Sequence, residues 1–270
     1  MARVGLGAVF RESVALCRFR ARFLAGMFAV IVALMLPFLW VRVVEPPSSA
    51  LLAVLMACVL LYFLVATALQ VSVFHTLITT LRGQASPIVP AGLIPRTLRT
   101  LLAELKVVLA VIIPGALMLL LAGFITVIFL TSEEGLAYPL LAGVISSFGL
   151  FAVGGWFSVR LGAGIASAAV GERLSFKDSW RMTRGHSLAL LVSILPFAVA
   201  PQIASYLLAD GASPLGSGLS AGMLVSMLVN GVVYMFTYAV LSVWYVRLKE
   251  RYDVEREAAV AVAEAGHGAS

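Results

Sequence analysis

The residues of this chain that could hold a metal ion or carry out acid–base chemistry are few and far apart. His75, His186 and His267 are widely separated, and no cluster of carboxylates or cysteines accompanies them. A zinc or di-metal site needs several such ligands at short, regular spacing. We interpret Cys17 and Cys58 as small apolar residues, since two cysteines in these contexts make no disulfide framework. The sequence therefore predicts no metal site and no cofactor.

Motifs for phosphate or dinucleotide chemistry are also missing. Neither a phosphate-binding loop nor a Gly-x-Gly-x-x-Gly fingerprint occurs. Paired carboxylates placed for acid–base catalysis inside an apolar segment do not occur either. We therefore expect no catalytic residue and a protein that is not an enzyme.

Polar side chains recur on one face of the last apolar segment. Asn230, Tyr234 and Tyr238 lie at i, i+4 and i+8, and side chains from other apolar segments could meet them. Two interpretations remain open: hydrogen bonds that join neighbouring helices, or a polar cavity for a small solute or lipid. The candidate cavity residues are Gln70, Gln202, Tyr206, Asn230, Tyr234 and Tyr238.

The composition indicates the class of protein that must position these residues. Of 270 residues, 61% are hydrophobic and 12% are charged, with a mean hydropathy of +1.05. Soluble domains contain about a quarter charged residues, so this chain belongs to the membrane class. The net charge of +6 could suggest nucleic acid, but the positions of the charges favour a membrane surface, and we expect no nucleic-acid partner.

Six segments are long enough to cross a hydrocarbon layer about 30 Å thick, which needs about 20 apolar residues in a helix. Strands of a membrane barrel would alternate polar and apolar residues, and these segments do not. We therefore predict an all-α integral membrane protein. Its expected spans are 23–44, 50–78, 107–131, 137–159, 187–209 and 219–246.

The basic residues predict the orientation of the spans. Of the 19 Lys and Arg residues, all but Arg42 fall in the N-terminal segment, the second and fourth connections, and the C-terminal tail. Basic connections stay in the cytoplasm, so both termini are expected there. We predict a single polytopic domain over 1–250 and a flexible cytoplasmic tail over 251–270.

A threefold internal repeat underlies this pattern. The segment 10–18 aligns with 176–184, and half of that offset, 83 residues, leads to a weaker match that begins at Leu93. The repeat units span about 7–82, 90–172 and 173–249. Each unit begins in the cytoplasm, so the repeats are parallel. We expect three hairpins of spans, each preceded by a cytoplasmic amphipathic helix.

The predicted amphipathic helices carry cations on one face and apolar residues on the other. In the middle one, Ile94, Leu98, Leu101 and Leu105 share a face. Helices of this kind anchor in the headgroup layer; recognition of a specific lipid and docking of a membrane protein are the alternatives. Arg160 is either a boundary residue or a buried cation. The candidate contacts to anionic lipid are Arg11, Arg18, Arg22, Arg96, Arg99, Arg160, Lys177, Arg181 and Arg184.

Two stretches carry a resemblance to a known family. The run 158–172 followed by 176–185 resembles a bacterial membrane family, and 243–251 is similar to its closing Tyr and Arg pattern. The family includes the membrane domain attached to some glycerophosphodiester phosphodiesterases and many free-standing proteins without assigned activity. The catalytic domain of those enzymes does not occur in this sequence. The resemblance therefore implies a six-span architecture in the bacterial inner membrane and no catalytic residues.

These observations predict a non-catalytic inner-membrane protein that acts as an accessory, scaffold or lipid-associated component. Phospholipid with anionic headgroups on the cytoplasmic face is the expected partner, with a membrane protein as a further partner. The alternative is a small transporter of a solute or lipid, with its cavity between the second, fifth and sixth spans.

Overall fold

A computed structural model describes residues 5–41, 49–85, 87–130, 137–209 and 221–267. Within these ranges all regular secondary structure is helical, without strands, which confirms the predicted all-α class. The helices are α1 (Leu6–Phe19), α2 (Ala21–Val41), α3 (Ser49–Leu81), α4 (Leu93–Leu130), α5 (Ala137–Val170), α6 (Phe176–Met182), α7 (Ser187–Ala209) and α8 (Ala221–His267).

Three of the described helices are long and apolar enough to cross a membrane. These segments are Met56–Leu81 in α3, Leu93–Leu117 in α4 and Leu228–Ala265 in α8. The expected spans 23–44, 137–159 and 187–209 correspond to α2, α5 and α7, where many side chains lie outside the described part. The structure therefore shows a helical protein in which three described segments are long and apolar enough to cross a membrane.

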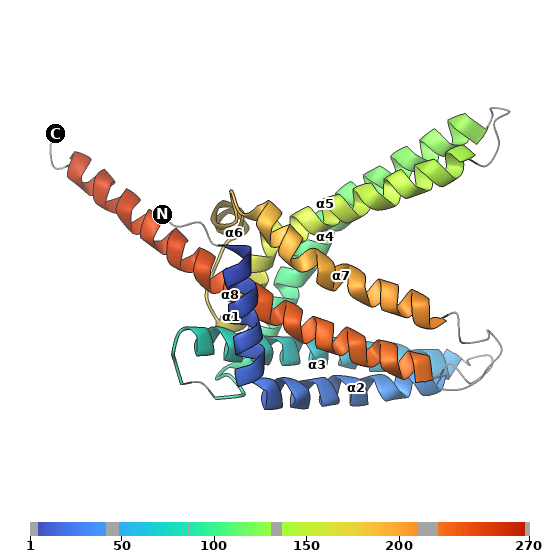
Figure 1. Ribbon diagram of the computed structural model, residues 1–270, viewed down its shortest axis with the longest axis horizontal. Coiled ribbons are helices and arrows are strands. Elements are labelled where there is room, and N and C mark those ends of the chain that lie inside the picture. The colour runs from blue at the N-terminus through green and yellow to red at the C-terminus, as the bar shows by residue number, and fades with distance from the viewer. Residues whose placement is uncertain (1–4, 42–48, 86, 131–136, 210–220, 268–270) are drawn as a thin grey trace.

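The helices meet at one end of the molecule and spread toward the other. Helix α8 packs against α1, α3 and α7, while α4 and α5 pack along each other and extend away from that group (Figure 1). The C-terminal half of α8 projects beyond the other helices in the opposite direction (Figure 1). The segment predicted as a flexible tail is therefore helical as far as His267.

The densest packing lies near the end from which α8 projects. Phe74 and Leu77 of α3 and Trp244 and Tyr245 of α8 are all almost completely buried. Val9 of α1 is buried in the same cluster, to which α5 and α7 also contribute side chains. A small cavity of about 20 Å³ remains beside Trp244, which is room for about one water molecule. The core thus holds together the parts of α1, α3, α5, α7 and α8 that lie near this end of the molecule.

A close approach between α2 and α8 depends on a residue without a side chain. A Cβ atom added to Gly231 would overlap the ring of Phe28. We expect Gly231→Ala to destabilise the protein by about 1–3 kcal/mol, because overpacking forces the ring from its position. Thermal unfolding in detergent measures this loss of stability. Gly162→Ala is the control, since no atom lies within 4 Å of its added Cβ. An equal effect of both variants would contradict the close packing.

The three basic segments differ in form, contrary to the expectation of one separate helix before each hairpin. Helix α1 ends in a turn at Arg20 and is followed directly by α2. In α4 the basic segment and the apolar segment form one uninterrupted helix, because no glycine or proline separates them between Arg96 and Ile113. Helix α6 stands alone, between turns with positive φ at Gly171 and Gly185.

Candidate functional site

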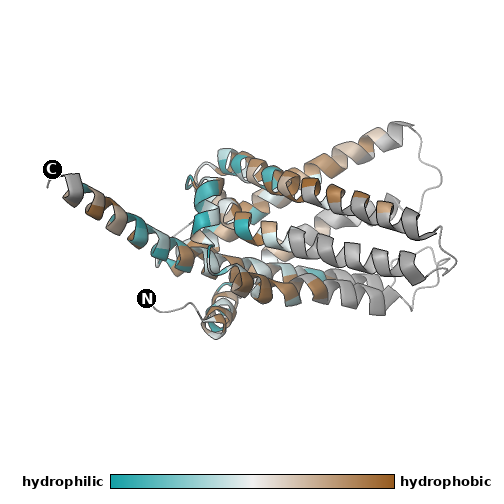
Figure 2. Cartoon of the chain, turned by 90° about the horizontal axis from the view of Figure 1, so that it is seen from above, coloured by the Kyte–Doolittle hydropathy of each residue, from teal (hydrophilic) through white to brown (hydrophobic). Residues whose placement is uncertain are grey.

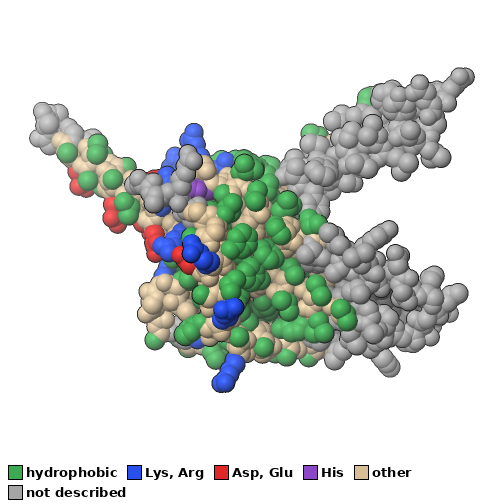
Figure 3. All heavy atoms as spheres, viewed as in Figure 1, with side chains coloured by type: hydrophobic (Ala, Val, Ile, Leu, Met, Phe, Trp, Pro, Cys, Tyr) green, Lys and Arg blue, Asp and Glu red, His purple; other side chains and the backbone are tan. Residues whose placement is uncertain are grey.

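Basic side chains gather at the end where the helices meet. On the face shown in Figure 3, Lys and Arg side chains surround the base of the projecting part of α8, and a hydrophobic surface continues away from them. Figure 2 shows the same separation, with hydrophilic residues at this end and along the projecting helix. We call the exposed Lys and Arg residues of α1, α6 and the first turns of α4 the basic layer.

Next to these cations, α4 has its apolar residues outside and its polar residues inside. Ile94, Leu98 and Leu105 are between 51% and 76% exposed, whereas Thr97 and Thr100 are buried against the protein. A soluble helix shows the opposite arrangement. This face of α4 is therefore suited to contact the acyl boundary of a bilayer.

Most carboxylates near the basic layer pair with other cations. Arg247 binds Glu12 at 2.6 Å, and the α8 pairs Lys249–Asp253 and Arg251–Glu255 lie within one helix. In the described part of the chain, none of the predicted lipid-contacting cations has a carboxylate oxygen within 4.0 Å. Seven of them are exposed: Arg11, Arg18, Arg22, Arg99, Lys177, Arg181 and Arg184.

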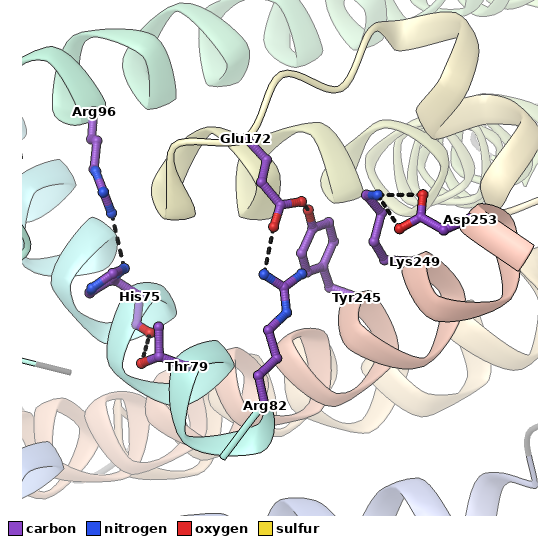
Figure 4. A network of polar contacts seen from close by, with 8 residues as sticks. All are labelled: His75, Thr79, Arg82, Arg96, Glu172, Tyr245, Lys249 and Asp253. Atoms are coloured by element: carbon purple, nitrogen blue, oxygen red, sulfur yellow. Dashed lines mark hydrogen bonds and ion pairs between the residues drawn. The ribbon is translucent and has the colours of Figure 1, made fainter. Parts of the chain in front are cut away.

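Arg96, a predicted lipid contact, is instead directed into the protein (Figure 4). Its Nη1 lies 3.0 Å from Nδ1 of His75 on α3. The guanidinium packs against Gly171, where an added Cβ would lie 3.3 Å from Cζ of Arg96. The spacing of residues along α4 predicted that Arg96 would face the lipid headgroups. Spacing alone cannot show which side of a helix is covered by another helix. Arg96 joins α3 and α4 to the turn after α5.

An ion pair and a tyrosine join the C-terminal ends of α3 and α5 to α8 (Figure 4). Arg82, after α3, binds Oε1 of Glu172, after α5, at 2.5 Å. The hydroxyl of Tyr245 on α8 donates to Oε2 of Glu172 at 2.6 Å. Burial alone would raise the pKa of Glu172, but hydrogen bonds from Arg82 and Tyr245 and the Arg82 and Lys249 charges together lower it. The carboxylate is therefore ionised at neutral pH.

The predicted cavity residues are only partly brought together. Tyr238 of α8 donates to Oε1 of Gln70 on α3 at 3.4 Å, and its ring packs edge-on against Phe74. Glu104 of α4, a carboxylate outside the predicted set, interacts electrostatically with Gln70. Tyr234 is 59% exposed. The side chains of Gln202 and Tyr206 lie outside the described part, and Asn230 is half-buried on α8.

These contacts favour the joining of helices over a solute cavity. The Gln70–Tyr238 hydrogen bond connects α3 and α8. Polar side chains between membrane helices contribute about 0.6 kcal/mol each on average in this role. Glu104 was missed because its sequence position places it in the basic segment of α4, and only the folded chain brings it beside Gln70.

The sequence also contains one short motif with the spacing of a catalytic serine. The run 218–222 reads Gly-Leu-Ser-Ala-Gly, which has the spacing of a nucleophile elbow. An elbow requires a strand before the serine, and the described residues contain no strand. Residues 218–220 themselves lie outside the described ranges. Among the described residues, His, Cys, Asp and Glu form no group that could hold a metal ion.

Comparisons with known proteins add no family to these observations. No family model, curated protein or solved structure matches the chain. Functional inference therefore rests on the basic layer, the apolar face of α4 and the contacts described above.

Proposed function

We propose that this chain is a non-catalytic, six-span protein of the bacterial inner membrane that binds anionic phospholipid headgroups through its basic layer. Both termini then lie in the cytoplasm, and the molecule acts as an accessory or scaffold component among lipids and membrane proteins. The three hairpins begin with α1, the first turns of α4, and α6. The hydrogen bond between Gln70 and Tyr238 argues against the alternative of a solute transporter.

The observation that carries this proposal is the exposure of cations without carboxylate partners beside exposed apolar side chains. Arg99 is exposed on α4, the helix whose outer face carries Leu98 and Leu105. Arg11 and Arg18 are exposed on α1, the helix that also carries Phe19, which is 72% exposed. Anionic headgroups supply the missing negative charge, and acyl chains cover the apolar side chains.

Neutralising four cations of the basic layer tests the proposal. We expect the variant with Arg11, Arg18, Lys177 and Arg181 all changed to Gln to lose its preference for anionic lipid, because each cation near the surface contributes about 1 kcal/mol. The measurement is electron paramagnetic resonance of spin-labelled phosphatidylglycerol and phosphatidylcholine in liposomes at low salt. The fraction of each label immobilised by the protein gives the preference.

The matched control keeps the charges and changes the side chains. Arg11→Lys, Arg18→Lys, Lys177→Arg and Arg181→Lys together should retain most of the preference. High salt should weaken the preference of the natural protein, since screening reduces these attractions. An unchanged preference in the neutralised variant at low salt would refute lipid binding by the basic layer.

A further inference from the structure

One cation is held in a setting unlike that of the exposed basic layer. Arg160, directly after the expected span 137–159, is only 9% exposed. Its guanidinium carbon lies 4.9 Å from the ring centroid of Trp156 and 4.6 Å from that of Trp180. The negative face of an indole ring attracts a cation held over it. The two indoles therefore hold the guanidinium in one position.

Backbone hydrogen bonds reinforce that position. Nη1 of Arg160 donates to the carbonyl oxygen of Trp180 at 3.1 Å. The hydroxyl of Ser179, which is fully buried, donates to the carbonyl oxygen of Arg160 at 2.8 Å. Helix α6 is thus attached to α5 at this residue. A fixed guanidinium loses less conformational entropy when it binds an anion.

The charge of Arg160 lacks a counter-ion within the described part of the chain. No carboxylate oxygen lies within 4.0 Å of the guanidinium, and the buried Nε has no hydrogen-bond partner. Asp178 on α6 is engaged elsewhere, since its Oδ1 accepts from Tyr252 at 2.8 Å and its Oδ2 from Ser175. A buried cation without an anion is costly.

A second cation lies close to the first. Arg184 is exposed and directly follows Thr183, whose hydroxyl donates to the same carbonyl oxygen of Trp180 that Arg160 binds. Burial and then the charge of Arg184 lower the pKa of Arg160. Trp156 and Trp180 are 36% and 37% exposed. Indoles partly exposed in this way are typical of the headgroup level of a membrane. An anion placed here would neutralise both cations at the depth where phosphate groups lie.

We propose that Arg160 and Arg184 together bind one phosphate group, supplied by a phospholipid headgroup at the membrane surface. The inference rests on the proposed function and narrows it to one site. Phosphate fits because its oxygens can accept from the fork of a guanidinium, and charge-assisted bonds of this type are short and strong. Trp156 and Trp180 position Arg160, and the exposed Arg184 supplies the second positive charge.

Native mass spectrometry of the full chain, transferred from nanodiscs that contain phosphatidylglycerol in phosphatidylcholine, tests the site. The natural protein should retain one phosphatidylglycerol molecule. We expect Arg160→Gln to reduce the affinity about tenfold to a hundredfold, because it removes charge-assisted hydrogen bonds. Arg184→Gln changes an exposed residue, so it should preserve the fold and still weaken retention. Circular dichroism checks the helical content of both variants.

Arg173→Gln is the matched control, because Arg173 is exposed in the same connection and the change in net charge is identical. It should leave retention unchanged. An equal loss of phosphatidylglycerol retention in Arg173→Gln and Arg184→Gln would overturn the proposal, because it would show that retention depends only on the general surface charge. Full retention in Arg160→Gln and Arg184→Gln would overturn it as well.

Competition separates the two sources of phosphate. Inorganic phosphate at constant ionic strength should leave the retained lipid in place if the headgroup and acyl chains bind together, whereas displacement would show a site for free phosphate. The proposed function is tested separately by the spin-label preference of the four-residue variant. If that preference is lost while Arg160→Gln retains its lipid, the basic layer binds lipid and this particular site does not exist.

Discussion

Replacing Trp244 with alanine is expected to destabilise the protein by about 3–5 kcal/mol, the range for removing a large aromatic side chain from a core. The Trp244 side chain is 1% exposed and lies in the buried cluster formed by α1, α3, α5, α7 and α8. Its Nε1 donates to Oγ of Ser193 on α7 at 3.0 Å. The substitution therefore removes both packing and a bond between α7 and α8.

Unfolding in mixed micelles with increasing SDS measures the loss. Ser193→Ala is the matched control, since it removes the hydrogen-bond partner and leaves the indole in place. We expect it to cost about 1–3 kcal/mol, the penalty for an unsatisfied buried donor. A cost for Trp244→Ala no larger than that for Ser193→Ala would show that the indole is not part of the core.

The second large effect is expected at the junction of Arg82, Glu172 and Tyr245. Changing Glu172 to Gln removes the charge that Arg82 binds and weakens the acceptor for Tyr245. Removing one partner of a fully buried pair costs about 3–5 kcal/mol, and the side chains here are 27% and 31% exposed. Solvent screening reduces the cost, and we expect about 2 kcal/mol for Glu172→Gln.

The pH dependence provides a second measurement of the same junction. The folded-state pKa of Glu172 is lowered relative to its ordinary value of 4.5, so its contribution to stability is present above that value. The contribution is lost as the pH falls through the lower, folded-state pKa. Glu172→Gln should therefore be less acid-sensitive than the natural protein.

Unfolding of both proteins at several pH values between neutral and about pH 3 gives the comparison, in the range where an ordinary glutamate titrates. Glu264→Gln is a suitable control. Glu264 is exposed on the projecting part of α8 and forms no ion pair with another residue in the described part of the chain. Equal acid sensitivity in the natural protein and in Glu172→Gln would contradict a stabilising role for this carboxylate.

The roles of individual cations were much harder to predict than the helices. Arg96 and Arg99 lie three residues apart on one basic segment, yet Arg96 bonds His75 inside the protein and Arg99 is exposed. From its sequence position Arg160 could be either a boundary residue or a buried cation, and the structure buries it between two indoles. Trp180 is 20 residues away in the chain, so no local pattern reveals that contact.

The helical class, and the helices long and apolar enough to cross a membrane, follow from local properties. Long apolar runs must satisfy their backbone hydrogen bonds internally, so hydropathy and length predict helices without knowledge of their neighbours. The Arg82–Glu172 pair joins residues 90 positions apart, and the Gln70–Tyr238 bond joins residues 168 apart. Such contacts depend on which helix faces pack together, and many arrangements of the same helices satisfy the same local pattern. The assignment of partners to charges therefore required the folded chain.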